Sequence, residues 1–133
     1  MKVKKVMWSM FVLLFVALMF GGCSKTSSPD GAVRAFLDEI DKGNTESAKV
    51  YFSGQYSGGY DEHDKKKLER NFPPGSIKNV TFTNIKAVGE SATLTVTIER
   101  TNGSPYTANL SMVKKGSDWK INYDGWSWPF PVE

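Results

Sequence analysis

The sequence of 133 residues contains a single cysteine, Cys23, and a single histidine, His63. One cysteine cannot form an intramolecular disulfide, and it nearly excludes a zinc site built from cysteine ligands. One histidine leaves no second imidazole to activate a serine, and the Gly-x-Ser-x-Gly pattern of a nucleophile elbow is absent. We therefore expect no hydrolase chemistry, and the stability of the fold must come from packing.

The chain that follows residue 22 also lacks a net charge. Three of the 17 basic residues, Lys2, Lys4 and Lys5, lie in the first 22 residues, which contain no acid, so the remaining 14 balance the 14 acidic residues. Nucleic-acid binding usually requires a net positive field, so no nucleic-acid partner is expected. Hydrophobic residues make up 40% and aromatic residues 13% of the sequence, which is ordinary for a globular protein.

Residues 1–22 have the order of a secretory signal: a basic start, an apolar run over residues 6–20, and two glycines before Cys23. As a helix, this apolar run would be about 22 Å long, shorter than the ~30 Å hydrocarbon core of a bilayer. A permanent transmembrane helix is therefore the weaker interpretation. The segment Phe20-Gly21-Gly22-Cys23 resembles the lipobox of bacterial lipoproteins, with Phe20 in the place where leucine is usual.

This resemblance implies a lipid, diacylglycerol with palmitate-like acyl chains, on Cys23. We predict a lipoprotein signal peptide over residues 1–22, a lipidated N-terminus and polar tether over residues 23–29, and a single domain over residues 30–133. The protein is expected to be exported and lipid-anchored to a bacterial membrane, on the periplasmic side or at the cell surface. Two or more acyl chains are needed for stable anchoring. The choice between inner and outer membrane stays open.

Three helices are predicted before residue 76, over residues 28–43, 44–52 and 61–72. Ser28 and Asn44 carry side chains that can cap the first two. The first helix has apolar residues at positions i, i+3, i+4 and i+7, which gives one stripe for packing. In the third, acids precede basic residues, the order that complements a helix dipole.

From Ile77 onward, apolar residues recur at every second position, a spacing that is typical of strands. A phase slip near Asn84 predicts a bulge that curves the sheet. The residues predicted to face inward are all without an ionisable group: Ala92, Leu94, Val96, Ile98, Ala108, Leu110 and Met112. The predicted fold is α+β, with two to three N-terminal helices packed on a curved four-stranded antiparallel sheet.

With the opening segment SPDGAVRAFL at residues 28–37 and the close SDWKI at residues 117–121, the chain resembles the nuclear transport factor 2-like (cystatin-like) superfamily. More narrowly, it is similar to small bacterial lipoproteins of that superfamily, including those with lumazine-binding-like domains. The resemblance implies a sheet bent around a long helix, a cone whose interior can be a pocket. Some members are cyclases, dehydratases or isomerases that place Asp, His or Tyr inside the cone.

The apolar inward face argues against such proton-transfer chemistry. We therefore predict a non-enzymatic small-ligand-binding or protein-interaction module, without cofactor or metal, whose partner is a small hydrophobic ligand or an envelope protein. The alternative is an enzyme of the same superfamily that acts on a small hydrophobic substrate. Fold alone does not decide between these functions. An ionisable group found buried inside the cone, such as Arg100, Asp124 or His63, would favour the enzyme.

The candidate ligand or partner residues are aromatic: Tyr56, Tyr60, Trp126, Trp128 and Phe130. The last three alternate with Ser and Pro after the final strand, so they either fold back to seal one end of the cone or stay exposed and contact a ligand.

Threonines form a secondary candidate surface, because period two places them on the face opposite the apolar residues: Thr81, Thr83, Thr93, Thr95, Thr97 and Thr107. This face could recognise a partner or a sugar, although threonine also suits any solvated antiparallel face. His63 stands among acids at a predicted helix start, where a solvated end is favoured over a metal or catalytic role.

Overall fold

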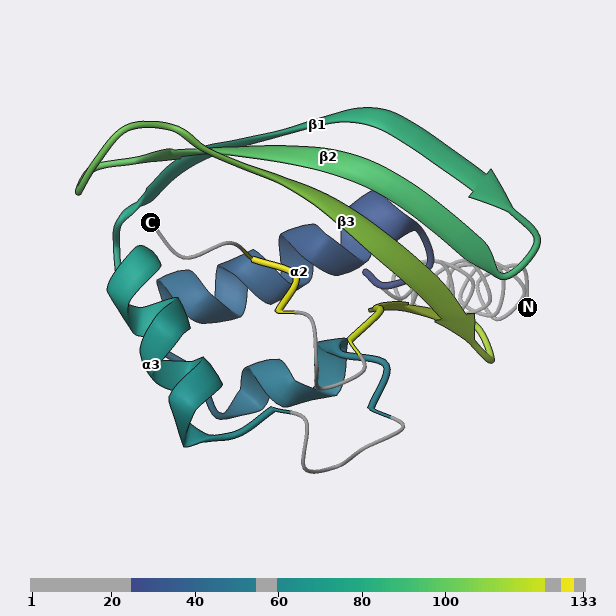
Figure 1. Cartoon of the computed structure of the whole chain (residues 1–133), viewed down its shortest axis with the longest axis horizontal. Coiled ribbons are helices and arrows are strands. Elements are labelled where there is room, and N and C mark those ends of the chain that lie inside the picture. Colours follow the sequence, from purple (N-terminus) through teal and green to yellow (C-terminus); the bar gives the residue numbers. More distant parts are fainter. Residues whose placement is uncertain (1–24, 55–59, 124–127, 131–133) are drawn as a thin grey trace, which may run out of the picture.

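The computed structural model describes residues 25–54, 60–123 and 128–130. They form, in chain order, α2 (Pro29–Asp41), the 3₁₀ helix η1 (Ser47–Tyr51), α3 (Glu62–Asn71), β1 (Ile77–Val88), β2 (Ser91–Arg100), β3 (Tyr106–Lys115) and β4 (Asp118–Ile121). Figure 1 shows the sheet arching over α2, with η1 and α3 on the other side of that helix. The predicted α+β fold with helices on one face of a curved antiparallel sheet is confirmed.

Helix α2 lies where the sequence predicts it and packs along its apolar stripe. The Ser28 Oγ accepts a hydrogen bond from the Gly31 amide at 3.2 Å, so Ser28 is the N-cap. Gly43 follows the helix with a φ of 84°, a left-handed conformation that glycine adopts without a steric penalty. The stripe is fully buried: Val33, Phe36, Leu37 and Ile40.

The second predicted helix differs from the expectation at its start. Asn44 does not cap it, because the short 3₁₀ helix begins only at Ser47, with Glu46 at its N-cap position. The Asn44 side-chain amide donates to Glu39 Oε2 at 3.0 Å. Ala48 and Phe52 are buried, as their spacing predicts.

Helix α3 begins with a reciprocal capping box. Asp61 accepts hydrogen bonds from the His63 and Asp64 amides, and the Asp64 carboxylate accepts one from the Asp61 amide. The predicted third helix is thus confirmed.

The four strands form an antiparallel meander in the order β1-β2-β3-β4. The register between β1 and β2 breaks between Thr83 and Lys86, and Asn84 within this break has a φ of 54°. The predicted bulge near Asn84 is therefore confirmed. It bends β1 locally.

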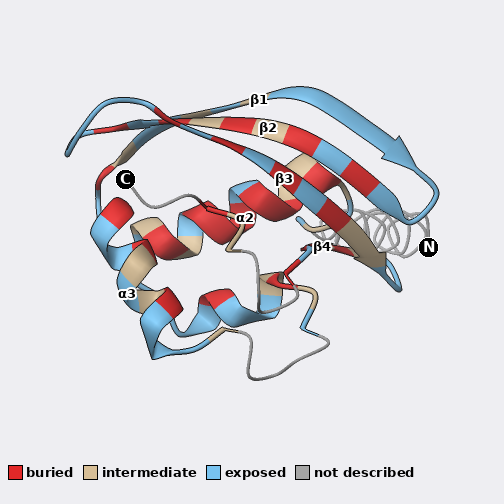
Figure 2. Cartoon of the chain, viewed as in Figure 1, coloured by how far each residue is buried: buried red, intermediate tan, exposed pale blue. Residues whose placement is uncertain are grey.

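The core lies between the inner face of the sheet and α2, as the buried segments of Figure 2 show. Every predicted inward residue is at most 4% exposed. The ring of Phe36 on α2 has aromatic neighbours on three sides: Tyr51, Phe52 and Phe130, with ring centroids 5.3 to 6.1 Å away. These side chains fill the space under the sheet, where the superfamily resemblance allowed a pocket.

The chain enters the domain beside the last strand. The Trp119 amide donates to the Thr26 carbonyl at 2.9 Å, and the Thr26 hydroxyl donates to Asp118 Oδ1. Among the described residues, no helix has the length and apolar character needed to cross a membrane.

Candidate functional site

The outward face of the sheet carries polar side chains in register across three strands. Strand alternation points Thr95 and Thr97 of β2 away from the core, opposite Asn109 and Thr107 of β3. The Thr95 hydroxyl donates to Asn109 Oδ1 at 2.7 Å, and the Thr97 and Thr107 hydroxyls lie 3.3 Å apart. The side chains on this face are thus ordered by one another rather than solvated singly.

A hollow of about 360 Å³, open to solvent, lies on this outward face beside the bulge of β1. Its volume is near the lower end of the range for small-molecule sites, about 300–1,000 Å³. The lining residues come from three adjacent strands: Asn84, Lys86, Thr93, Leu94, Thr95, Asn109, Leu110 and Ser111. Leu94 and Leu110 are buried, and the surface of the hollow combines apolar side-chain carbons with hydroxyl and amide groups.

The lining of the hollow is suited to hydrogen bonding. Hydroxyl groups donate and accept, amide groups offer both functions at fixed geometry, and Lys86 adds one positive charge. Asn84 holds a left-handed backbone conformation, which asparagine tolerates better than most residues other than glycine. Lys86 is the one ionisable residue among those that line the hollow.

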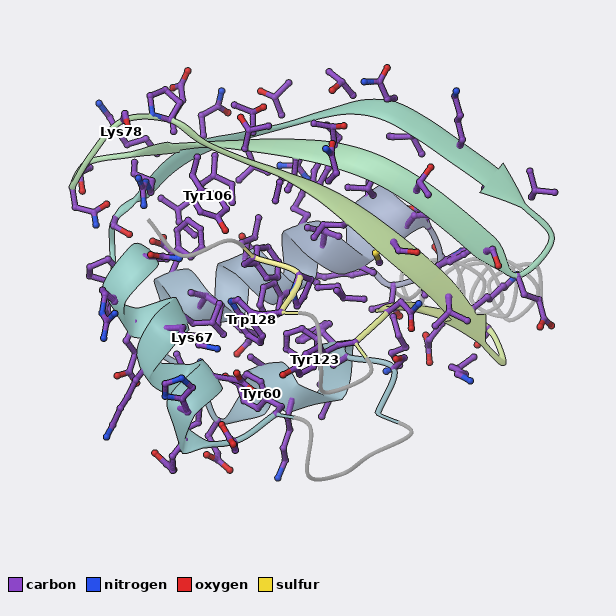
Figure 3. The ribbon with its side chains drawn as sticks, in the orientation of Figure 1. Tyr60, Lys67, Lys78, Tyr106, Tyr123 and Trp128 are labelled. Carbon is purple, nitrogen blue, oxygen red and sulfur yellow. The ribbon has the colours of Figure 1, made fainter. Side chains whose placement is uncertain are left out.

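The aromatic candidates are placed differently from one another. Phe130 is fully buried and stacks on Phe36 with a centroid distance of 5.3 Å, so it offers no surface to a ligand. Trp128 is half-buried, and its ring lies 5.4 Å from the ring of Tyr123 and 5.8 Å from that of Phe52. Figure 3 shows Trp128 between Tyr123 and α3.

Tyr60 is also half-buried, and its hydroxyl donates to the Thr45 carbonyl at 2.6 Å. Burial, together with the nearby Asp64 carboxylate, raises the pKa of Tyr60 well above its usual value, so the phenol is protonated at neutral pH. Of the remaining candidates, Tyr56 and Trp126 lie outside the described residues, as does the lipidation candidate Cys23. The packing of Trp128 and Phe130 favours the interpretation that the C-terminal aromatic segment closes the core.

A buried carboxylate that sequence reasoning did not single out lies beside these rings. Asp64 is 3% exposed and accepts hydrogen bonds from the Tyr123 hydroxyl at 3.2 Å and the Asp61 amide at 3.4 Å, and the Lys67 ammonium lies 3.5 Å away. Lys67 in turn lies 5.4 Å from the centre of the Trp128 ring. Each charge in this group is paired, which indicates a structural role.

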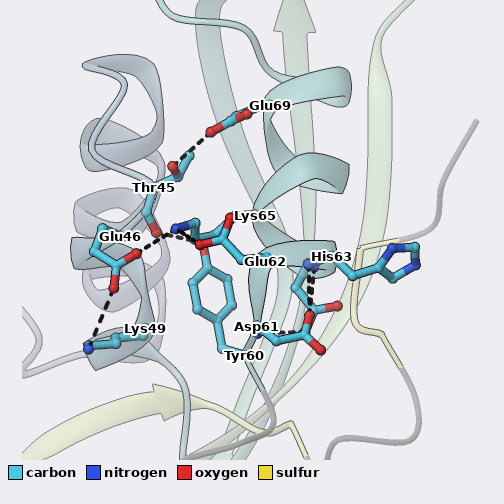
Figure 4. Close-up of polar contacts among 10 residues, drawn as sticks. Thr45, Glu46, Lys49, Tyr60, Asp61, Glu62, His63, Lys65 and Glu69 are labelled. Carbon is cyan, nitrogen blue, oxygen red and sulfur yellow. Dashed lines mark hydrogen bonds and ion pairs between the residues drawn. The ribbon is translucent and has the colours of Figure 1, made fainter.

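His63 lies at the first turn of α3, where its side chain is exposed and points away from the neighbouring ion pairs (Figure 4). Lys65 sits between Glu46 at 2.6 Å and Glu62 at 2.5 Å, and these bonds raise the pKa of Lys65 and lower that of Glu46. In the part of the chain that the structure describes, no group of three or more His, Cys, Asp or Glu side chains could hold a metal.

Arg100, the last residue of β2, follows the alternation that points Ile98 inward, and it is an ionisable residue that is buried. Its guanidinium donates to the carbonyls of Asn71 and Ser104 at 3.0 and 3.1 Å and lies over the rings of Phe72 and Tyr106. These contacts hold the end of the sheet against α3. A buried ionisable group on the inner side of the sheet is the observation named above as favouring the enzyme, so the burial of Arg100 counts toward that alternative. Its guanidinium is bonded to two backbone carbonyls, and it does not line the hollow.

The sequence predicted the polar face and the bulge, but not the hollow that they form together. The threonine alternation and the phase slip at Asn84 were the available signals. The contributions of Asn109 and Ser111 depend on the β2–β3 register, which sequence alone left undetermined.

Comparison with known proteins identifies a family model and two solved structures. The model described as "Domain of unknown function (DUF4878)" matches residues 21–122. A protein from Campylobacter jejuni, proposed to be an NTF2-like transpeptidase, has a crystal structure that is similar with a TM-score of 0.50 and 16% identity, over 71% of this chain and 96% of that one. This similarity supports the nuclear transport factor 2-like fold.

The second structure is a de novo designed protein with a curved β-sheet, with a TM-score of 0.42 and 17% identity, over 70% of this chain and 82% of that one. The search of curated proteins finds no match.

Proposed function

The chain belongs to the DUF4878 family, a domain of unknown function, and we propose that it is a lipid-anchored protein of the bacterial cell envelope that acts as a non-enzymatic binding module. The observation that supports the binding role is the hollow on the outward face of the sheet, which is lined by hydroxyl and amide side chains. The anchor rests on the leader and on the lipobox-like segment that ends at Cys23.

The anchor is tested by the intact mass of the protein from the membrane fraction, beside a Cys23→Ala variant. We expect a wild-type mass that lacks residues 1–22 and carries added acyl chains, and a variant without these chains. A full-length, unacylated wild-type mass would contradict the lipoprotein assignment.

The hollow favours a small, neutral, hydroxyl-rich ligand such as a saccharide, because its hydroxyl and amide groups can both donate and accept hydrogen bonds. Lys86 can donate to an additional oxygen at the rim. A hydrophobic ligand, which the sequence favoured, would make fewer hydrogen bonds with these side chains than a hydroxyl-rich one.

Binding is tested with diacetylchitobiose, a neutral disaccharide, by NMR titration of the full chain in detergent. Thr95→Val removes a hydroxyl from the hollow at nearly constant shape, and Thr81→Val makes the same change on the same face outside it. One net hydrogen bond is worth about 0.5–1.5 kcal/mol, so Thr95→Val should raise the Kd about 2- to 10-fold. Equal effects of the two variants, or no saturable shifts at the hollow, would refute this ligand class.

The transpeptidase description of the Campylobacter protein is not extended to this chain, because 16% identity supports only the fold. The superfamily-type enzyme remains the alternative function. It would require an acid or base beside the bound ligand, and the residues that line the hollow offer only an ammonium group.

A further inference from the structure

The segment that enters the domain is fixed by contacts at Thr26. Its carbonyl accepts from the Trp119 amide at 2.9 Å, and its hydroxyl donates to Asp118. Gly31 supports the same arrangement, because a Cβ at this position would lie 2.4 Å from the Lys25 carbonyl oxygen. The first turn of α2 thus admits the entering chain only because residue 31 lacks a side chain.

These contacts shorten the tether between the lipid and the domain. The sequence predicts a polar tether of six residues over Ser24–Pro29, with a reach of about 20 Å. In the structure, Pro29 begins α2 and Thr26 is bonded to β4, so only the chain from Cys23 to Thr26 separates the lipid from a fixed point. Three residues span at most about 10 Å.

The fixed point lies at one end of the sheet, which we name the turn end: residues 25–26, 86–91 and 113–118. Thr26 contacts the start of β4, Asp118 pairs with Lys115 of β3, and the Lys114 amide donates to the Glu90 carbonyl at 2.8 Å. The β1–β2 and β3–β4 turns therefore lie at the same end of the sheet as the entering chain, as Figure 1 shows.

The turn end is basic within a neutral mature chain. It contains four lysines and two acids: Lys25, Lys86, Lys114, Lys115, Glu90 and Asp118. The rest of the mature chain therefore has an excess of acids. The most exposed large apolar side chain described, Val88 at 82%, stands at the tip of the β1–β2 turn.

We propose that the turn end faces the membrane and contacts its anionic headgroups, so that the short tether holds the domain in one orientation. This proposal rests on the proposed lipid at Cys23. The charge pattern fits a bilayer surface, because clustered lysines are attracted to anionic lipids. Val88 can enter the interfacial region, where an isolated apolar side chain is favoured over water.

The test compares two labelled variants of the full lipoprotein in vesicles of phosphatidylcholine and phosphatidylglycerol that contain a headgroup nitroxide. Ser117→Cys lies in the turn end, and Ser104→Cys lies in the β2–β3 connection; both positions are exposed. Cys23 is the only cysteine in the native sequence, and the proposed acyl chain on its sulfur prevents reaction with the fluorophore. The ten residues of β2 place the two labels about 33 Å apart along the sheet.

We expect strong quenching of the label at position 117 and almost none at position 104. Adding Lys86→Glu and Lys115→Glu should reduce the quenching at position 117 by at least half in anionic vesicles. Equal quenching at both positions in a sample whose mass confirms the acyl chains would overturn the orientation alone. An unacylated mass would overturn the lipid anchor and the orientation with it.

Discussion

Replacement of Phe130 by alanine should destabilise the domain strongly. The ring is fully buried and contacts Phe36 with a centroid distance of 5.3 Å and Trp128 at 6.1 Å. Truncation of a buried phenylalanine to alanine costs about 3–5 kcal/mol, through lost transfer free energy and the cavity that remains. At about 4 °C per kcal/mol for a domain of roughly 100 residues, Tm should fall by about 12–20 °C.

The assay is thermal unfolding of the full chain in detergent, followed by far-UV circular dichroism. Val88→Ala is the matched control, because Val88 is 82% exposed and its truncation should change the stability by no more than about 0.5 kcal/mol. A Phe130→Ala protein that loses less than about 3 °C would refute the packing of the C-terminal segment into the core. The aromatic residues would then be available to a ligand, the alternative that the sequence left open.

Three further substitutions probe the remaining features. Asp64→Ala removes an acceptor from the buried Tyr123 hydroxyl and should cost about 1–3 kcal/mol in the same unfolding assay; an unchanged Tm would exclude this role. Gly31→Ala forces the Lys25 carbonyl to move, so trypsin should cleave after Lys25 faster than in wild type, and equal rates would count against the fixed entry. The ion pair with Lys65 lowers the pKa of Glu46, so the small contribution of this pair to folding stability is present above about pH 4.5 and is lost on acidification. Glu46→Gln should therefore flatten the decrease of Tm between pH 6 and 3. Parallel Tm curves for the variant and the wild type would contradict this.

The features that the sequence predicted well are those that depend on neighbouring residues. The helical spacing of the apolar residues from Val33 to Ile40 and the cap at Ser28 identify α2 without any knowledge of the elements it packs against. The period-two alternation of β2 and β3 separates buried from exposed positions, and the phase slip at Asn84 locates the bulge. Each of these signals reflects local backbone geometry, which the chain carries in any context.

The features that were missed depend on particular side-chain contacts, several of them between distant parts of the chain. Asp64 looks like an ordinary acid at a helix start, and only the return of Tyr123, 59 positions later, gives its carboxylate a buried partner. Asn44 looks like a cap, but Glu39 binds its amide. Arg100 follows an apolar strand face and is buried because two backbone carbonyls accept its hydrogen bonds. No periodicity encodes such pairings.

The two proposed surfaces share Lys86 and therefore constrain one another. Thr93 and Thr95 of the hollow lie two and four residues from Ser91 in the turn end, which corresponds to about 7–13 Å along β2. If the turn end rests on headgroups, the hollow lies close to the bilayer surface, within reach of a membrane-associated ligand. A partner that stays far from the membrane could not reach it, so loss of the short tether should weaken binding of a membrane-associated ligand and leave binding of a soluble disaccharide unchanged.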